Sequence, residues 1–167
     1  VIAPFAPGGS ADTLGRLVAQ ELTTTLGQPF VVENRAGAGG VTGSAQVARA
    51  APDGYLFVIS GIASHVIAPA INPNTGFDPV RDFTHVAFLG GPPTVLVVNA
   101  ALPARNLAEF IALGRAGRAL SYASPGAGTH GHLFAVAFAS AAGINMEHIP
   151  YRGAGPAGGL LRQRGPG

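Results

Sequence analysis

The sequence contains no cysteine, no lysine and no tryptophan among its 167 residues. The absence of cysteine excludes disulfide bonds and thiolate metal sites. The absence of lysine excludes the phosphate-binding loop G-x-x-x-x-G-K-[ST], because the lysine of that loop reaches the terminal phosphates of a nucleotide. Phosphoryl transfer of the P-loop type is therefore outside the chemistry that this sequence supports.

Charged residues are also scarce, at 11% of the chain, and the ten basic residues are all arginines scattered along it. A nucleic-acid-binding surface needs clustered basic residues, so we expect no nucleic-acid partner. The apolar run at 133–144 is too short to cross a bilayer, which predicts a chain without its own membrane span. The chain opens directly on strand-like residues, so we expect a signal peptide and the start of this strand to be absent from it.

The common motifs of catalytic and metal sites are lacking as well. Ser124, His132 and Asp12 are the residue types of a hydrolase triad, but no G-x-S-x-G elbow is present to expose the serine. Only His130 and His132 are close together among the five histidines, and neither an H-E-x-x-H motif nor an acidic ligand accompanies them. We therefore expect no catalytic residue, no metal and no cofactor.

What the sequence does contain is a repeated order of strand, glycine-rich loop and helix. Apolar spacing and turn residues predict helices at 10–26, 41–50, 65–71, 107–116 and 132–143, the first capped by Ser10. Short apolar runs predict strands at 30–33, 55–60, 85–90, 94–99, 120–124 and 147–150. This alternation is typical of an α/β fold with mostly parallel sheets, in which ligands gather at the carboxyl ends of the strands.

The glycine loops begin near positions 8, 37, 126 and 153, and this pairing favours two α/β lobes. Glycine-rich loops are also frequent in α/β proteins of any kind, so the spacing alone leaves the number of lobes open. The segment 101–106, ALPARN, is the expected boundary, which places one lobe at 1–100 and the other at 101–167.

Two of the glycine loops have the composition of anion-binding sites. The first, PFAPGGSAD at 4–12, precedes a helix, where backbone N–H groups and the helix dipole attract negative charge. Asp12 in this loop has a second interpretation, as an acid that only stabilises the first turn of its helix. Ser64 and His65 follow the strand predicted at 55–60 and are either ligand contacts or capping residues.

The loop SPGAGTHGH at 124–132 allows two functions. Gly126, Gly128 and Gly131 match the dinucleotide motif G-x-G-x-x-G, but Glu147 begins its predicted strand where the ribose-binding acid of that motif ends one. The alternative function is thus a nicotinamide-dinucleotide-dependent oxidoreductase. Tyr151 and Arg152, further along, suit a carboxylate, although an exposed arginine near a chain end is an equal alternative.

Six stretches in order carry a resemblance to a known family: PFAPGGSAD, LGQPFVVENRAGAGG, ARAAPDGY, FDPVRDF, SPGAGTHGHL and HIPYRG. From Val1 to about Leu161 the chain resembles the periplasmic solute-binding proteins of tripartite tricarboxylate transporters, the TctC or Bug family. The resemblance implies a non-enzymatic protein with the two-lobed periplasmic-binding-protein fold. Such a protein captures a di- or tricarboxylate, an amino acid or an aromatic acid, and delivers it to transporter subunits in the membrane.

The resemblance also implies the residues of the site. These are Phe5, Pro7, Gly8, Gly9, Ser10 and Asp12 in one loop, Ser124, Gly126, Gly128, Thr129 and His132 in the other, and Ser64, His65 and Tyr151 beside them. Arg152 stands where a lysine is more often expected, which keeps the charge and changes the geometry. Family members run to nearly twice this length. We therefore expect the chain to be truncated, with a first lobe that lacks its C-terminal return segment and only the N-terminal part of the second.

Overall fold

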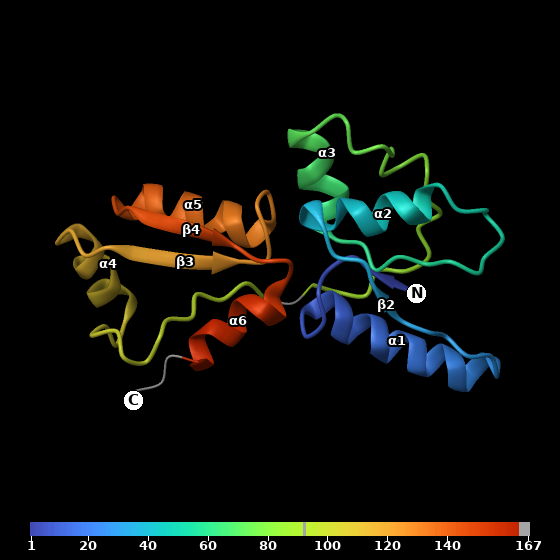
Figure 1. The fold of residues 1–167 in the computed structure, drawn as a ribbon, viewed down its shortest axis with the longest axis horizontal. Coiled ribbons are helices and arrows are strands. Elements are labelled where there is room, and N and C mark those ends of the chain that lie inside the picture. Colours follow the sequence, from blue (N-terminus) through green and yellow to red (C-terminus); the bar gives the residue numbers. More distant parts are fainter. Residues whose placement is uncertain (92, 164–167) are drawn as a thin grey trace.

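The computed structural model describes residues 1–91 and 93–163, which form two α/β lobes lying side by side (Figure 1). The first lobe contains β1 (Ile2–Ala3), α1 (Ser10–Leu26), β2 (Glu33–Asn34), the turn η1 (Ala38–Gly40), α2 (Val41–Ala48), the π-helical turn η2 (Ala63–Ile67) and α3 (Ala68–Ile71). The second contains α4 (Leu107–Arg115), β3 (Leu120–Ser124), α5 (His130–Ala142), β4 (Met146–Pro150) and α6 (Ala154–Gln163). The predicted two-lobed α/β class is confirmed.

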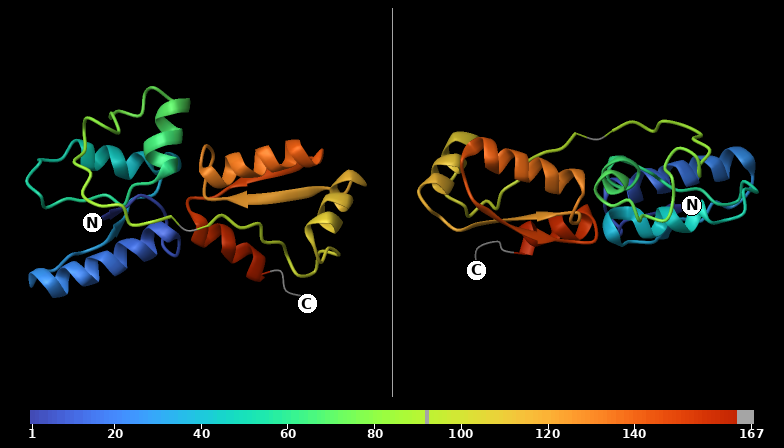
Figure 2. Two further views of the ribbon diagram at one scale, coloured as in Figure 1. Left: turned by 180° about the vertical axis from the view of Figure 1, so that it is seen from behind. Right: turned by 90° about the horizontal axis from the view of Figure 1, so that it is seen from above.

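The chain passes from the first lobe to the second between α3 and α4 (Figure 2). Within the described ranges, no helix is both long enough and apolar enough to cross a membrane. The helix predicted at 65–71 is present as η2 followed by α3.

Helix α1 has the bounds predicted from the sequence, but its cap differs. The residue before the helix is Gly9, and Ser10 is already helical, so the prediction of a Ser10 cap was wrong. The cap lies one residue earlier because the carbonyl oxygen of Gly9 already accepts the N–H of Thr13, at 3.0 Å. Asp12 in the first turn reaches back to accept the N–H of Gly8, the residue before the cap, and so fixes the chain that enters the helix. At the other end Gly27 adopts a left-handed φ of 66° and donates its N–H to Thr23.

The first sheet is short because its central strand is short. Ile2 pairs in parallel with Glu33 on one side and bridges Val58 on the other, and β1 ends after Ala3. Pro4 follows and has no N–H for the ladder. Since a neighbour can pair only along this length, the strands predicted at 30–33 and 55–60 are reduced to β2 and to the single bridge at Val58.

The strands predicted at 85–90 and 94–99 were wrong. Within the described residues these two segments have no strand structure, and Phe88, Val86 and Val95 are 92%, 75% and 70% exposed. Their apolar residues favour a sheet, but a strand requires a neighbour whose backbone groups pair with its own. No such neighbour lies beside them in the part of the chain that the structure describes.

The second lobe is built around β3 and β4, which run parallel from the pair Leu120 and Met146 to the pair Ser124 and Pro150. Phe110, Ala142 and Ile144 form its buried core, against which Leu120, Phe138, Met146, Val98, Leu102 and Ala104 pack. Helix α6 was not predicted from the sequence, because the segment AGPAGGLLRQ is rich in glycine and contains a proline. Its proline stands in the first turn, where the missing N–H costs no helical hydrogen bond.

Candidate functional site

A cleft of about 420 Å³ lies between the lobes. Its walls come from the segments at or just beyond the carboxyl ends of all four strands. Phe5 follows β1, 36–40 follow β2, 125–127 follow β3, and 150–152 close β4. The carboxyl ends of both parallel sheets therefore face one another across the cleft, which is where open α/β folds bind their ligands.

Three of the residues predicted for the site, Phe5, Gly126 and Tyr151, line this cleft. The other predicted residues are not in its lining: Pro7, Gly8, Gly9, Ser10, Asp12, Ser64, His65, Ser124, Gly128, Thr129 and His132. Ser10 instead borders a separate groove with Leu14 and Leu89. Several of the others form hydrogen bonds to the backbone of the first and second loops: Asp12, Ser124, Thr129 and His132.

The glycine loop after β2, which contributes Ala36 to Gly40, was predicted as a loop, but none of its residues was predicted for the site. A signal for its role was present, because the stretch NRAGAGG has the same strand, glycine loop and helix order as the two loops that were assigned to the site. Pro125, Ala127, Pro150 and Arg152 complete the lining beyond the predicted set.

The glycines of these loops allow backbones to approach closely. A Cβ atom on Gly39 would lie 3.5 Å from the carbonyl oxygen of Ala127, in the opposite lobe. A Cβ atom on Gly40 would lie 3.0 Å from the ring of Phe5, and one on Gly126 would lie 3.2 Å from the carbonyl oxygen of Tyr151. Both φ angles, 97° at Gly40 and 147° at Gly126, also favour glycine. The cleft is thus walled largely by backbone.

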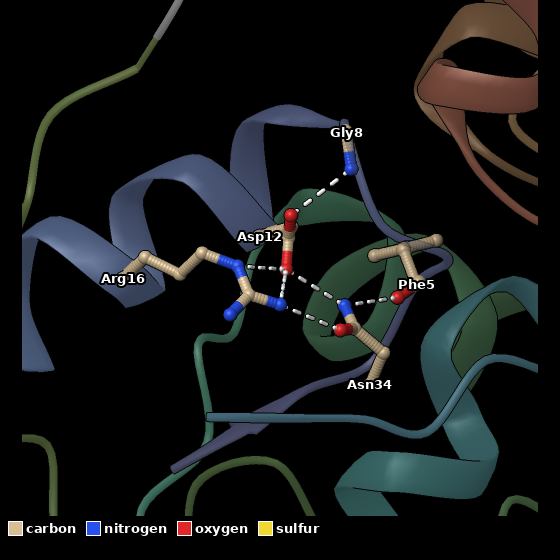
Figure 3. Close-up of polar contacts among 5 residues, drawn as sticks. All are labelled: Phe5, Gly8, Asp12, Arg16 and Asn34. Atoms are coloured by element: carbon tan, nitrogen blue, oxygen red, sulfur yellow. Dashed lines mark hydrogen bonds and ion pairs between the residues drawn. The ribbon is translucent and has the colours of Figure 1, made fainter. Parts of the chain in front are cut away.

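The first loop is fixed by the carboxylate of Asp12, which is 6% exposed (Figure 3). Its Oδ2 accepts a hydrogen bond from the N–H of Gly8 at 3.0 Å. Its Oδ1 accepts two hydrogen bonds, from Nε of Arg16 at 3.0 Å and from Nδ2 of Asn34 at 2.9 Å. Asn34 also donates to the carbonyl oxygen of Phe5 at 3.0 Å. Asp12 therefore connects α1 to Gly8 within the first loop and to Asn34 at the end of β2, and Asn34 extends the network to Phe5.

These contacts decide the charge of Asp12. The hydrogen bond from Gly8, followed by those from Arg16 and Asn34 and the charge of Arg16, lowers the pKa of Asp12 below its ordinary value against the opposing effect of burial. The carboxylate is ionised near neutral pH, and both of its oxygens are occupied by protein donors. The Asp12 carboxylate therefore stabilises the conformation of the first loop.

The first loop also touches the second lobe. Ala6 donates its N–H to the carbonyl oxygen of Arg152 at 2.8 Å. A Cβ atom on Gly153 would lie 3.0 Å from the nitrogen of Ala6, and one on Gly155 would overlap the carbonyl oxygen of Pro7. The lobes are thus in contact through backbone where β4 leads into α6.

The second loop is fixed by two buried hydroxyl groups. Ser124 Oγ lies 3.1 Å from both the nitrogen and the carbonyl oxygen of Gly126, and Thr129 Oγ1 donates to the same carbonyl at 2.7 Å. Ser124 and Thr129 are 1% and 0% exposed. They orient Gly126, which lines the cleft.

Two histidines lie directly behind this loop. Gly128 donates its N–H to Nδ1 of His132 at 3.1 Å, and Nε2 of His148 lies 2.7 Å from Ser124 Oγ. The two rings are stacked with centroids 4.1 Å apart. His132 was predicted for the site and His148 was not, because His148 lies 24 residues from Ser124 in sequence and only the register of β3 and β4 brings them together.

Ser64 and His65 lie behind the first-lobe wall of the cleft. Ser64 is fully buried, and its Oγ is 3.0 Å from Nδ1 of His65. The His65 ring packs against Phe77 and Phe83, with centroid distances of 5.6 Å and 4.7 Å. Burial lowers the pKa of His65, and the neighbouring His85 lowers it further. Ser64 therefore lies beneath Gly40, where an added Cβ atom would be 3.0 Å from its own, and His65 belongs to the aromatic cluster beside it.

The geometry does not favour the dinucleotide alternative. Glu147 is the second residue of β4, opposite Ser121, whereas the carboxyl end of that strand is Pro150 at the cleft. The ribose-binding acid of a dinucleotide site has to stand at this carboxyl end. Among the described residues there is also no group of three or more histidine, cysteine, aspartate or glutamate side chains that could hold a metal ion.

Comparison with known proteins agrees with this geometry. The family described as "Tripartite tricarboxylate transporter family receptor", TctC, matches residues 14–163. Protein BugT of Bordetella pertussis is 37% identical over 94% of this chain, which covers 49% of BugT. The chain therefore spans about half the length of such curated relatives.

Two solved structures have a similar fold and were determined with carboxylates. An R. palustris protein solved with adipate is 33% identical, with a TM-score of 0.92, over 98% of this chain and 55% of its own. MatC from Rhodopseudomonas palustris, solved with bound malate, is 34% identical, with a TM-score of 0.87, over 97% of this chain and 55% of its own.

Proposed function

Because the chain belongs to the family of tripartite tricarboxylate transporter receptors, we propose that it is a periplasmic solute-binding protein without enzymatic activity. In this proposal the interlobe cleft captures a small carboxylate, and transporter subunits in the membrane receive the ligand. The ligand class comprises di- and tricarboxylates, amino acids and aromatic acids. Malate and adipate, bound by two proteins of similar fold, are the first ligands to test.

The observation that carries the proposal is the convergence of four strand-end loops on one cleft. The lining is mostly glycine, alanine and proline, so that backbone amides stand close to whatever enters. Backbone N–H groups bind carboxylate oxygens in any position that a glycine loop allows. Recognition of this kind depends on the shape of the loops. The hydrogen bonds behind the loops are consistent with this, because they fix that shape.

Arg152 gives the cleft its charge. It is the only positively or negatively charged side chain among the residues that the structure places in the lining. Its guanidinium presents several donors in one plane and pairs with a carboxylate through two hydrogen bonds. Tyr151 beside it adds a hydroxyl group. In our proposal Arg152 receives one carboxylate of a dicarboxylate, and the backbone of the glycine loops receives the other.

A ligand between the lobes also links them. Ligand contacts from both lobes favour the closed arrangement, because they form together only when the loops after β1 and β2 face those after β3 and β4. The backbone contact between Ala6 and Arg152 keeps the lobes joined at one point. In this proposal the lobes close around the solute before it is delivered to the membrane partner.

Isothermal titration calorimetry tests the proposal. Malate, adipate and citrate should bind one per chain with and without EDTA, and NAD should not bind. Arg152→Gln should weaken dicarboxylate binding by about tenfold, the value of one charge-assisted hydrogen bond. Arg118→Gln is the matched control, because Arg118 is an exposed arginine outside the cleft lining.

The outcomes separate the alternatives. Binding that disappears on chelation points to a metal-dependent site and contradicts the proposal. Tight binding of NAD without binding of any carboxylate supports the dinucleotide alternative. An equal effect of the two arginine substitutions removes Arg152 from the site.

A further inference from the structure

Three aromatic rings stack on the face of β3 and β4 that α5 covers. Tyr122 and His148 are cross-strand partners with ring centroids 4.9 Å apart, and His132 of α5 lies on His148 at 4.1 Å. The two imidazole planes are within 17° of parallel. Two histidines in this arrangement are stable as neutral rings and repel each other when both are charged.

Each imidazole is connected to the loop that lines the cleft. His132 accepts the N–H of Gly128 through Nδ1, so Nδ1 carries no proton and the neutral ring carries its proton on Nε2. His148 contacts Ser124 Oγ, which in turn contacts both the nitrogen and the carbonyl oxygen of Gly126. Gly126 and Gly128 are the two positions where the second loop adopts positive φ, at 147° and 73°.

Among the described residues, no acidic side chain forms an ion pair or a hydrogen bond with either histidine of the pair. Tyr122 of β3 is the other titratable ring in the stack, and burial raises its pKa, so it is uncharged. Glu147 precedes His148 on β4 and therefore points to the opposite face of the sheet. On α5, His130 has no hydrogen-bond or ion-pair partner in the described part of the chain. Burial, followed by the proximity of His132, lowers the pKa of His148.

We propose that His132 and His148 are positioning residues that hold the second loop in its ligand-binding shape only while the stacked pair is uncharged. The inference rests on the proposed function in one respect, namely that residues 125–127 contact the ligand. The effect of the two histidines on the conformation of the second loop does not depend on which ligand binds. Neither ring lines the cleft, so each acts on the ligand through Gly126 or Gly128.

Protonation acts on the two rings in different ways. A proton on Nδ1 of His132 turns the acceptor into a donor that faces the N–H of Gly128, so this hydrogen bond is lost. His148 can keep a hydrogen bond to Ser124 in either charge state, because the hydroxyl both donates and accepts. The loop should therefore be released mainly by His132, and the stacked His148 adds repulsion once both rings are charged.

The first experiment needs no ligand. Proton–nitrogen correlation spectra of the histidine rings should show an unprotonated Nδ1 in His132 at about pH 7.5. On acidification to about pH 5, the backbone amide of Gly128 should shift along the same titration curve as the His132 ring. A protonated Nδ1 at neutral pH, or a Gly128 amide that does not follow the ring, overturns the proposal.

The second experiment uses two substitutions of one residue. In His132→Asn, Oδ1 takes the place of Nδ1 as an acceptor that does not titrate, whereas His132→Ala removes the acceptor. Affinities for malate and adipate are compared by calorimetry at about pH 7.5 and about pH 5.5. The unmodified protein should lose about tenfold in affinity on acidification, which corresponds to one hydrogen bond.

The variants should then separate. His132→Asn should bind nearly as well as the unmodified protein at the higher pH and lose most of the acid sensitivity, whereas His132→Ala should bind weakly at both values. The control, His130→Ala, removes a histidine two positions away and should keep the acid response. Acid sensitivity that persists in His132→Asn overturns the proposal. If neither acid binds at neutral pH, the proposed function fails for these ligands, while the ring spectra still decide the positioning role.

Discussion

The two loops that meet at the cleft are fixed by opposite kinds of chemistry. The first loop depends on an ionised acid, Asp12, which accepts hydrogen bonds from Gly8, Arg16 and Asn34. The second depends on hydroxyl groups and on two stacked imidazoles, of which His132 accepts the N–H of Gly128 through an unprotonated Nδ1. Both loops present glycine backbone to the cleft, so the difference lies behind the surface that a ligand meets.

This difference gives the loops different pH ranges. The pKa of Asp12 is lowered in the folded chain, so its stabilising contribution is complete above the ordinary value of 3.8 and is lost only as the pH falls toward the lowered pKa. The pKa of His148 is also lowered in the folded chain. Below the ordinary value of 6.5 the unfolded chain therefore takes up a proton on this histidine before the folded chain does, so the stabilising contribution of neutral His148 is lost as the pH falls from 6.5 toward the lowered pKa. Mild acid should thus affect one loop and spare the other.

The largest effect is expected where the second loop requires a left-handed backbone. Gly128 has a φ of 73°, and a Cβ atom there would lie 2.9 Å from Cδ1 of Ile71 in the first lobe. A β-branched residue is strained in this conformation, so Gly128→Val should weaken carboxylate binding by about a hundredfold. Calorimetry measures the affinity, and thermal unfolding measures the accompanying loss of stability.

Gly117→Val is the control for this substitution. Gly117 has a similar φ of 83°, but a Cβ atom there meets nothing within 4 Å. It should lower stability by a comparable amount and leave binding unchanged. If Gly117→Val impairs binding as strongly, the effect of Gly128→Val is one of general stability and says nothing about the loop.

A smaller effect is expected from the acid that fixes the first loop. Asp12→Ala removes the acceptor for three donors, of which the Gly8 N–H and the Asn34 amide have defined positions in the loop. Denaturant unfolding should show a loss of about 2 kcal/mol, as for a buried charged hydrogen-bonding group. Binding should fall less than in Gly128→Val. The reverse order would mean that Asp12 itself contacts the ligand.

The elements that the sequence predicted well have either local signals or a paired neighbour in the fold. Helix α1 has the expected bounds of 10–26, and β3 has the expected bounds of 120–124. The apolar spacing of α1 lies within the segment, and its stop signal, Gly27, follows directly. Strand β3 formed as predicted because β4 pairs with it along its whole length. The segments 85–90 and 94–99 have the same strand-like composition, but a strand depends on a partner that the sequence of the segment cannot specify.

The same distinction applies to the site. The motifs containing Phe5, Gly126 and Tyr151 were recognised from short stretches, and these residues line the cleft. His148 has no motif of its own, and its place beside Ser124 follows from the register of two strands. The residues behind a loop are harder to predict than the loop itself, because tertiary contacts alone bring them there.

The amides of the two loops provide a direct comparison in one experiment. Between about pH 7.5 and about pH 5, the Gly8 amide should not shift, because Asp12 stays ionised in this range, whereas the Gly128 amide should. Both signals are read from the same proton–nitrogen correlation spectra. A Gly8 amide that moves together with Gly128 would show that the loops are coupled through the cleft and do not titrate independently.

The smallest effect is expected from Arg16, which shares the first network with Asp12. Its Nη2 lies 2.9 Å from Oδ1 of Asp12, but its side chain is 54% exposed. Water and salt screen a pair of this kind, and the carboxylate keeps the Gly8 and Asn34 donors when the arginine is removed. Arg16→Gln should therefore lower the free energy of unfolding by about 0.5 kcal/mol, and this difference should shrink further in high salt. Denaturant unfolding at two salt concentrations measures it, with Arg49→Gln as a control on an arginine outside the network. A loss as large as that of Asp12→Ala, unchanged by salt, would show that the first loop is fixed by the ion pair and not by the hydrogen bonds of Gly8 and Asn34.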